Sequence, residues 1–238
     1  MNRSTLVLLI MILVVPTVAG VGFNTSHINA FLPLTTEYVN GSTVRDFYNN
    51  THFLNNGATF NSWYGDFVPV EVDYVYSNLA MVTSCTNFAV TFLGWFDNAA
   101  DKTILSKQNH QGNIDGAFVV NAGGSSVLSA YAMDDSANAY RGKKTAGAIG
   151  TGSWYHFAYT HNTTFQNGSF WVDGAIQYLD FSSGTFAGIE DMIDPVRIGT
   201  GWTAGAAYSP HDGRITNVTL ICGYIINGTE VNESRAVN

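Results

Sequence analysis

The sequence predicts an all-β protein, an antiparallel β-sandwich of two sheets, and three observations support this. Aromatic residues make up 13% and charged residues only 12% of the 238 residues, and 24 glycines are available for turns. Such a composition favours strands over helices. Along many short segments bulky and small or polar side chains alternate, and this period of two indicates strands. No long segment has the 3.6-residue period of an amphipathic helix, so almost no helix is expected after residue 20.

The segment 152–174 shows the pattern most clearly. Bulky and small or polar residues alternate over 154–161 and again over 169–172. A polar loop separates the two runs, and Asp173-Gly174 ends the second with a pair that accepts the positive φ angles of a tight turn. The segment therefore predicts two successive hairpins. Their expected role is scaffold, and the residues expected to fill the core or shape turns are Trp154, His156, Phe170, Val172 and Gly174.

Nine segments of this kind follow one another, with Gly, Asn, Asp and Ser between them. This order is typical of an antiparallel sandwich and not of a parallel α/β sheet. Chains of this length commonly form one all-β domain, so residues 21–238 are predicted to be a single domain. The predicted strands are 68–76, 87–96, 102–108, 116–122, 127–133, 153–161, 168–179, 194–200 and 213–225.

Several segments also match known strand motifs in one collinear series from Thr36 to Glu230. VEVDYV has the Asp-Tyr-Val of a first strand, GSWYHFAYT the Trp-x-His pattern, SFWVDG a Val-Asp-Gly end and GRITNVTL a closing Gly-x-Ile-x-x-Val pattern. NFAVTFLGWF looks like the strand usually written Phe-Thr-x-x-x-Trp. In this order they resemble the laminin-G-like and pentraxin-like branch of the concanavalin A-like jelly rolls. The resemblance implies a jelly roll that binds its ligands on rim loops.

The charge of the chain argues against nucleic acid as a partner. Ten basic and eighteen acidic residues give a net charge of −8, and the largest basic cluster is Arg141, Lys143 and Lys144. A groove for a phosphate backbone needs more positive charge than this.

The first twenty residues have the layout of a secretory signal peptide. One basic residue, Arg3, precedes an apolar run from Leu6 to Val15, a breaker at Pro16 and small residues at Ala19 and Gly20. A retained membrane anchor is the alternative, although the run is short for a spanning helix. We therefore expect a secreted or surface-exposed protein whose only membrane contact would be an uncleaved leader.

Two further features fit export. The sequence Asn-x-Ser/Thr, an acceptor for N-glycosylation, occurs at eight positions after residue 20, although an Asn-rich and Thr-rich chain also generates such sites by chance. The two cysteines, Cys85 and Cys222, most simply form one disulfide if their strands are antiparallel neighbours, and two buried free thiols are the alternative. The predicted glycosylation sites are Asn24, Asn40, Asn49, Asn162, Asn167, Asn217, Asn227 and Asn232.

Residues for catalysis are poorly represented. Glu71-x-Asp73 is similar to part of the acidic Glu-x-Asp-x-Glu strand of glycoside hydrolases in the same superfamily, but the third acid is missing. Retaining hydrolysis needs two carboxylates about 5 Å apart on one face. We therefore expect no enzyme, with a glycoside hydrolase as the less favoured alternative.

Calcium is the one cofactor that the sequence suggests, because it needs six to eight oxygen ligands, several of them charged. Asp134, Asp135 and Asn138 share one polar loop, and Asp101 occupies a position resembling a pentraxin ligand. A polar turn without metal is the alternative, since Asp, Ser and Asn are ordinary turn formers. No cofactor is predicted with certainty.

Aromatic residues near predicted loops are the candidate ligand-binding groups, because such rings can stack on sugars or dock a partner. For Trp202 the alternative is that it caps the core. The candidate residues are Trp202, Tyr208, His211, Tyr131, Tyr140 and Arg141.

The sequence thus predicts a non-enzymatic carbohydrate-binding or adhesion domain, with glycans or glycosylated surface proteins as partners and a homo-oligomer as an option. This function rests on the family resemblance more than on a site. The alternative is a structural component of an envelope, filament or virion surface that acts through protein-protein contacts. An exposed apolar patch or a self-complementary edge strand would favour that alternative.

Overall fold

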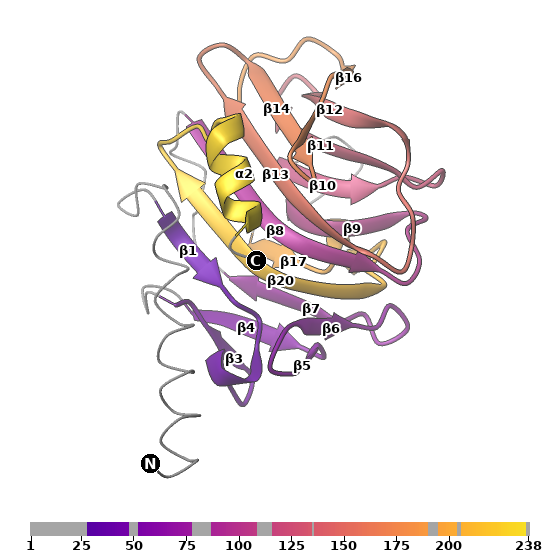
Figure 1. Ribbon diagram of the computed structural model, residues 1–238. Coiled ribbons are helices and arrows are strands. Elements are labelled where there is room, and N and C mark those ends of the chain that lie inside the picture. Colours follow the sequence, from indigo (N-terminus) through magenta and orange to yellow (C-terminus); the bar gives the residue numbers. More distant parts are fainter. Residues whose placement is uncertain are drawn as a thin grey trace, which may run out of the picture.

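The computed structural model describes residues 28–47, 52–77, 87–108, 116–134, 136–189, 195–203 and 206–236. Two large sheets lie face to face in it (Figure 1), and every strand pair is antiparallel. The predicted all-β sandwich is therefore confirmed. The predicted leader lies outside these residues. No helix in the described ranges combines the length and hydropathy that a membrane span needs.

The first sheet has eight strands, in the order β15-β14-β13-β8-β20-β6-β5, and β1 also pairs with β20. Its centre is formed by the two ten-residue strands β8 and β20 together with β13. The bounds are β1 Ile28–Leu32, β5 Thr59–Phe60, β6 Gly65–Phe67, β8 Asn87–Phe96, β13 Trp154–Asn162, β14 Asn167–Val172, β15 Ala175–Gln177 and β20 Gly213–Cys222.

The second sheet has ten strands, in the order β16-β12-β11-β10-β9-β17-β7-β4-β3-β2. A separate hairpin, β18 (Gly201–Thr203) and β19 (Ala206–Tyr208), packs against β9. A short 3-10 helix, η3, covers Thr36–Tyr38. The bounds are β2 Val39–Asn40, β3 Thr43–Arg45, β4 His52–Asn56, β7 Tyr74–Ser77, β9 Lys102–Gln108, β10 Gly116–Ala122, β11 Val127–Asp134, β12 Ala139–Ala148, β16 Leu179–Ser183 and β17 Val196–Ile198.

The core fills the space between the two sheets. Phe88 on β8 and Phe118 on β10 join them across this space, with ring centroids 5.3 Å apart, and both side chains are fully buried. His156 and Phe170 are buried as predicted, whereas Trp154 is 38% exposed. The prediction that Trp154 fills the core is therefore wrong. Strand alternation places Trp154 on the face of β13 that points away from the core, where it pairs with Trp95. His156, two residues further along, lies on the same outer face and is nevertheless buried.

The carboxyl end of the chain forms a helix that was not predicted, α2 (Gly228–Ala236). Its first turn is capped reciprocally: Oδ1 of Asn227 accepts hydrogen bonds from the amides of Thr229 and Glu230, and Oε2 of Glu230 accepts one from the amide of Asn227. Val231 of the helix and Trp171 of β14 belong to a second small apolar cluster. The helix therefore covers part of the outer face of the eight-stranded sheet (Figure 1).

The two strands next to the predicted disulfide, β8 and β20, are antiparallel neighbours, as the bridge requires. β8 and β20 pair along their length, and Cys222 lies opposite Phe88, three residues after position 85. Cys85 itself lies outside the described residues, so the bridge stays a prediction. We expect alkylation with iodoacetamide in denaturant to label neither cysteine before reduction and both afterwards. In the Cys85→Ser variant, Cys222 should be labelled without reduction. Labelling of both cysteines in the unreduced protein would contradict the bridge.

Candidate functional site

The outer face of the ten-stranded sheet carries a row of residues that strand register aligns. Tyr76 pairs with Arg197, Arg197 with Ser106, and the series continues across β10, β11, β12 and β16. None of these side chains belongs to the core cluster between the sheets. Register therefore brings residues from distant parts of the chain onto one sheet face, where the three aromatic side chains are partly exposed and the other members of the row are buried. The row consists of Tyr76, Arg197, Ser106, Val119, Tyr131, Gly142 and Phe181.

The hairpin β18–β19 adds two aromatic residues to this surface. Gln108 Nε2 donates to the Tyr208 hydroxyl at 2.8 Å, and the Thr200 hydroxyl donates to the carbonyl of Tyr208 at 3.1 Å. A side chain at Gly201 would overlap the Tyr208 ring, so only glycine permits this close packing. These contacts hold Tyr208 over β9, and the opposite strand of the hairpin carries Trp202.

Trp202 lies against a buried arginine. The Cζ atom of Arg197 is 4.2 Å from the centroid of the Trp202 ring. The NH1 group of Arg197 donates a hydrogen bond to the carbonyl of Gln108 at 2.9 Å. Tyr74 meets Trp202 edge to face at 5.9 Å and lies 5.5 Å from Tyr76. Burial raises the pKa of Tyr74 although Arg197 lowers it, so the phenol keeps its proton at neutral pH. A cation over an indole at such a buried place contributes on the order of 2 kcal/mol.

A second group of rings lies at the other end of the row. Tyr131 is 5.2 Å from Tyr140 and 5.3 Å from Phe181, and Lys144 Nζ lies 5.7 Å from the Phe181 centroid. Burial raises the pKa of Tyr131, and the nearby Tyr208 hydroxyl adds to this, which connects the two groups. We call the whole surface the aromatic band. It comprises Tyr74, Tyr76, Trp202, Tyr208, Tyr131, Tyr140 and Phe181, all partly exposed.

The aromatic band unites four of the six predicted ligand-binding residues, namely Trp202, Tyr208, Tyr131 and Tyr140. Sequence reasoning missed Tyr74, Tyr76 and Phe181, and also the polar groups of Arg197 and Gln108. The strand alternation of Tyr74 and Tyr76 about buried Val75 was the available signal for the first two. The positions of Phe181, Arg197 and Gln108 in the site depend on which strands pair in the sheet, and a single segment does not indicate this.

His211, the fifth predicted ligand-binding residue, is fully buried and takes no part in a surface. Its ring lies edge to face with Phe67 and Phe96 at 6.2 and 5.0 Å, and Nε2 lies 3.1 Å from the carbonyl oxygen of Trp95. Burial lowers the pKa of His211 to about 4. His211 therefore packs in the protein interior, and its prediction as a ligand-binding residue is wrong.

Arg141, the sixth, points away from the aromatic band because it alternates with Tyr140 and Gly142 along β12. Its NH1 donates to the carbonyl of Gln166 at 3.2 Å. It lines a separate open pocket of about 320 Å³ whose other lining residues are Gly142, Phe165, Gln166, Asn167, Asp180 and Ser182.

Among the predicted calcium ligands that the structure describes, Asp101 lies apart from Asp134. The Asp134 carboxylate is buried and already accepts hydrogen bonds from the amides of Ala137, Ala187 and Gly188 and from the Ser136 hydroxyl. These bonds outweigh burial and lower the pKa of Asp134.

Asp101 lies beside Gly123, at the opposite end of β11 from Asp134. Asn138 is an exposed turn residue with a positive φ, and Asp135 lies outside the described residues. Among the described His, Cys, Asp and Glu residues, no group of three could hold a metal. Asp134 therefore serves to fix the loop through its hydrogen bonds, and calcium binding stays a prediction.

The acidic pair Glu71 and Asp73 does not lie on one strand face. β7 begins only at Tyr74, and Val72 between the two acids has φ 56°, so this stretch is a turn and not the predicted strand. Glu71 is exposed, whereas Asp73 is buried and accepts a hydrogen bond from the Val68 amide at 2.9 Å. Burial raises the pKa of Asp73 despite that bond. The geometry of a retaining hydrolase is absent at this pair.

The predicted glycosylation sites differ in exposure. Asn162 and Asn217 are partly buried, and Asn24 and Asn49 lie outside the described residues. Asn227 is exposed, but its side-chain oxygen caps α2. Whether any site is glycosylated stays a prediction. The exposed ones are Asn40, Asn167, Asn227 and Asn232.

Fold and site together define a β-sandwich domain with an aromatic outer surface. No model of a known protein family matches the sequence, and no curated protein does either.

Among solved structures, the chain is similar to domain 4 of the extracellular GH43 arabinanase from Geobacillus stearothermophilus in complex with arabinotriose. The TM-score is 0.62 at 12% identity, covering 88% of this chain and 98% of that one. It is also similar to botulinum neurotoxin type C, whose cell entry depends on two ganglioside molecules (TM-score 0.65, 13% identity, 92% of this chain, 53% of that one). A sialidase mutant from Trypanosoma rangeli matches at 0.57 and 18% identity, covering 92% of this chain.

The chain spans about a third of the sialidase chain and about half of the toxin chain. At these identities the similarity establishes the fold. It is an antiparallel β-sandwich, and a shared fold does not by itself define a role.

Proposed function

We propose that the protein is a non-enzymatic carbohydrate-binding domain that holds a glycan along the aromatic band. The observation that carries the proposal is that seven partly exposed rings gather on one side of the sandwich, with Trp202 and Tyr208 held in place by the buried Arg197 and Gln108. Rings provide stacking surface for the apolar faces of sugars, while the tyrosine hydroxyls can form hydrogen bonds with sugar hydroxyls. The arabinotriose-bound domain and the ganglioside-dependent toxin among its structural neighbours support the same class of ligand.

Two further points complete the proposal. Glu71 and Asp73 do not lie on one strand face, and this supports binding without hydrolysis. The leader-like segment 1–20 and the glycosylation sites support a secreted or surface-displayed protein whose partners are glycans or glycosylated proteins.

The test is a glycan array followed by calorimetry on the best ligand. Trp202→Ala and Tyr140→Ala are each expected to weaken binding about tenfold, the effect of losing about 1.4 kcal/mol of stacking. Tyr178→Ala is the matched control, because Tyr178 is 77% exposed and lies outside the aromatic band. Binding should persist in EDTA, since backbone amides already occupy the Asp134 carboxylate.

Unchanged affinity in both band variants, with thermal unfolding showing that they are folded, would contradict this site. A complete absence of binding on the array would contradict the proposed function and favour contacts with proteins.

A further inference from the structure

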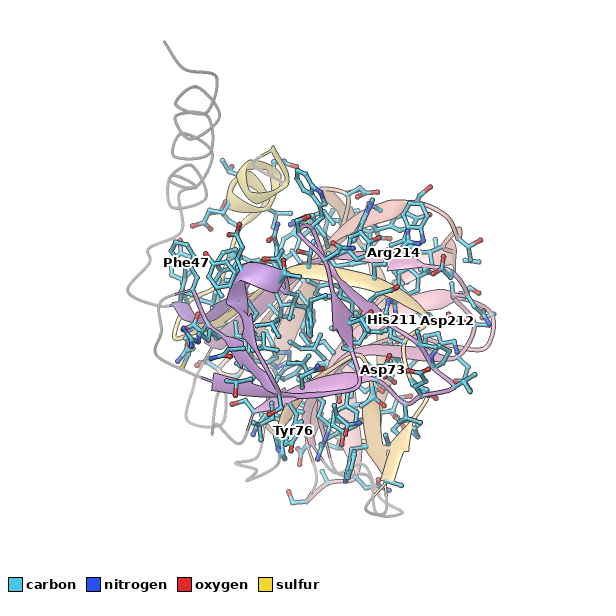
Figure 2. The ribbon with its side chains drawn as sticks, turned by 90° about the horizontal axis from the view of Figure 1, so that it is seen from below. Phe47, Asp73, Tyr76, His211, Asp212 and Arg214 are labelled. Carbon is cyan, nitrogen blue, oxygen red and sulfur yellow. The ribbon has the colours of Figure 1, made fainter. Side chains whose placement is uncertain are left out.

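The opposite sheet carries a second aromatic surface that the sequence did not reveal. Trp154 on β13 pairs with Trp95 on β8, Trp95 with Arg214 on β20, and Arg214 with Asp66 on β6. These residues lie on the outer face of the eight-stranded sheet, since none of them belongs to the core cluster. Figure 2 shows Arg214 and Tyr76 of the aromatic band on opposite sides of the sandwich, with His211 between them.

The turn between β5 and β6 carries a further tryptophan, Trp63, directly before Tyr64. Oδ1 of Asn61 accepts hydrogen bonds from the amides of Trp63 and Tyr64 at 2.7 and 3.0 Å, which fixes the turn between β5 and β6. Trp63 is 78% exposed, and Trp154 is 38% exposed. Such exposure of two indoles is unusual for a surface that binds nothing.

The rings surround the guanidinium of Arg214. Its Cζ lies 5.1 Å from the centroids of both Tyr64 and Trp95, and Trp154 lies 5.7 Å from Tyr64 and 6.0 Å from Trp95. The nearest Asp66 oxygen is 4.0 Å from the Nε of Arg214, beyond hydrogen-bond distance, and this buried Nε has no hydrogen-bond partner among the described residues. We call these residues, Tyr64, Trp95, Trp154 and Arg214, the tryptophan shelf, and we include Trp63 in it because Trp63 directly precedes Tyr64 in the turn.

The charged groups beside the tryptophan shelf favour a neutral ligand over a negatively charged one. The carboxylates of Asp66 and Asp97 lie next to it, Asp97 accepting a hydrogen bond from Trp95 Nε1 at 2.9 Å, against the single positive charge of Arg214. A negatively charged ligand would meet a net negative surface. A neutral ligand with an apolar face and several hydroxyls finds indole surface, guanidinium donors and carboxylate acceptors together.

We propose that the tryptophan shelf is a second carbohydrate-binding site, specific for neutral pyranosides. It does not require the aromatic band to bind sugar, because the two surfaces belong to different sheets and share no residue. If both bind, one molecule joins two glycan chains, and the avidity for a dense glycan surface exceeds the affinity of either site.

The five tryptophans of the chain provide the readout. In the ¹⁵N-labelled full-length protein, each indole N–H gives its own signal: Trp63, Trp95 and Trp154 report on the tryptophan shelf, Trp202 on the aromatic band, and Trp171 lies under α2. The probes are cellotetraose, maltotetraose and mannotetraose as neutral oligosaccharides and trigalacturonate as an acidic one. At least one neutral probe is expected to shift the signals of Trp63 and Trp154, and trigalacturonate to leave them unchanged.

Trp63→Ala is expected to lower that affinity about tenfold without affecting the fold, because the side chain lies at an exposed turn. The Trp202→Ala variant should keep the shelf shifts, which separates this proposal from the function of the aromatic band. Shelf signals that respond to no neutral probe would overturn the proposal, as would a response to trigalacturonate alone. The first result is also what a protein-docking surface would give.

Discussion

Replacing Gly142 by alanine is expected to destabilise the protein by about 4 kcal/mol or more, enough to unfold many domains of this size. A methyl group on Gly142 would lie 2.0 Å from the carbonyl oxygen of Ala130 and 2.5 Å from the Cα of Tyr131. Both are backbone atoms of the neighbouring strand β11, which moves only if the sheet opens. Urea denaturation followed by tryptophan fluorescence measures the loss.

Gly147→Ala is the matched control, because Gly147 lies on the same strand and has no atom within 4 Å of the added methyl group. This variant is expected to stay within about 0.5 kcal/mol of the parent. Equal stability of the two variants would show that β11 and β12 are not paired in the observed register. Gly142 lies between Tyr131 and Phe181 in the sheet, and its lack of a side chain leaves room for their rings. The prediction therefore also tests the strand register that brings these two rings of the aromatic band together.

The stability of the protein is expected to fall as the pH decreases from about 6.5 to about 4. Burial lowers the pKa of both His161 and His211 to about 4, from an ordinary value of 6.5. Because the unfolded chain binds these protons more readily, the stabilisation is complete above pH 6.5 and is lost as the pH falls through the folded-state value. Below pH 4, the lowered pKa of each histidine reduces the free energy of unfolding by about 3 kcal/mol relative to its value above pH 6.5.

The contacts of His161 explain why it stays neutral. Its ring stacks on Phe88 at 5.9 Å, its Nδ1 lies 3.0 Å from the Tyr159 hydroxyl, and Arg141 adds repulsion to a positive charge. The measurement is the urea midpoint at a series of pH values. In the double variant His161→Phe and His211→Phe the slope between pH 6.5 and 4 should become shallow, whatever its stability at neutral pH. A parent protein whose midpoint is constant over this range would refute the prediction.

Several strands were predictable because their own residues carry the pattern. β8, β9 and β10 have the predicted bounds, since alternation or continuous apolar runs mark buried strands between turn residues. β12 is not among the predicted strands, because its glycines and lysines have low strand propensity. It forms a strand because β11 and β16 pair with it on both sides. α2 was missed although its Asn-x-x-Glu start, Asn227 to Glu230, is a capping signal.

The candidate sites show the same limit. Trp202 and Tyr208 were identified because aromatic residues among small ones are conspicuous in a predicted loop. Nothing local indicated that Arg197 would lie beneath Trp202, or that Tyr64 and Trp154 would share a surface with Arg214. Those contacts join positions far apart in the chain, and they depend on strand order.

From its residues alone, this protein is a two-layer antiparallel β-sandwich, because the period of two and the turn residues act within each segment. Which side chains face solvent together was decided by the tertiary structure. Register across the ten-stranded sheet aligned the aromatic band, and register across the other sheet formed the tryptophan shelf. The physical reason is that strand pairing is set by burial of the core faces, and the opposite faces receive whatever residues alternate with the core.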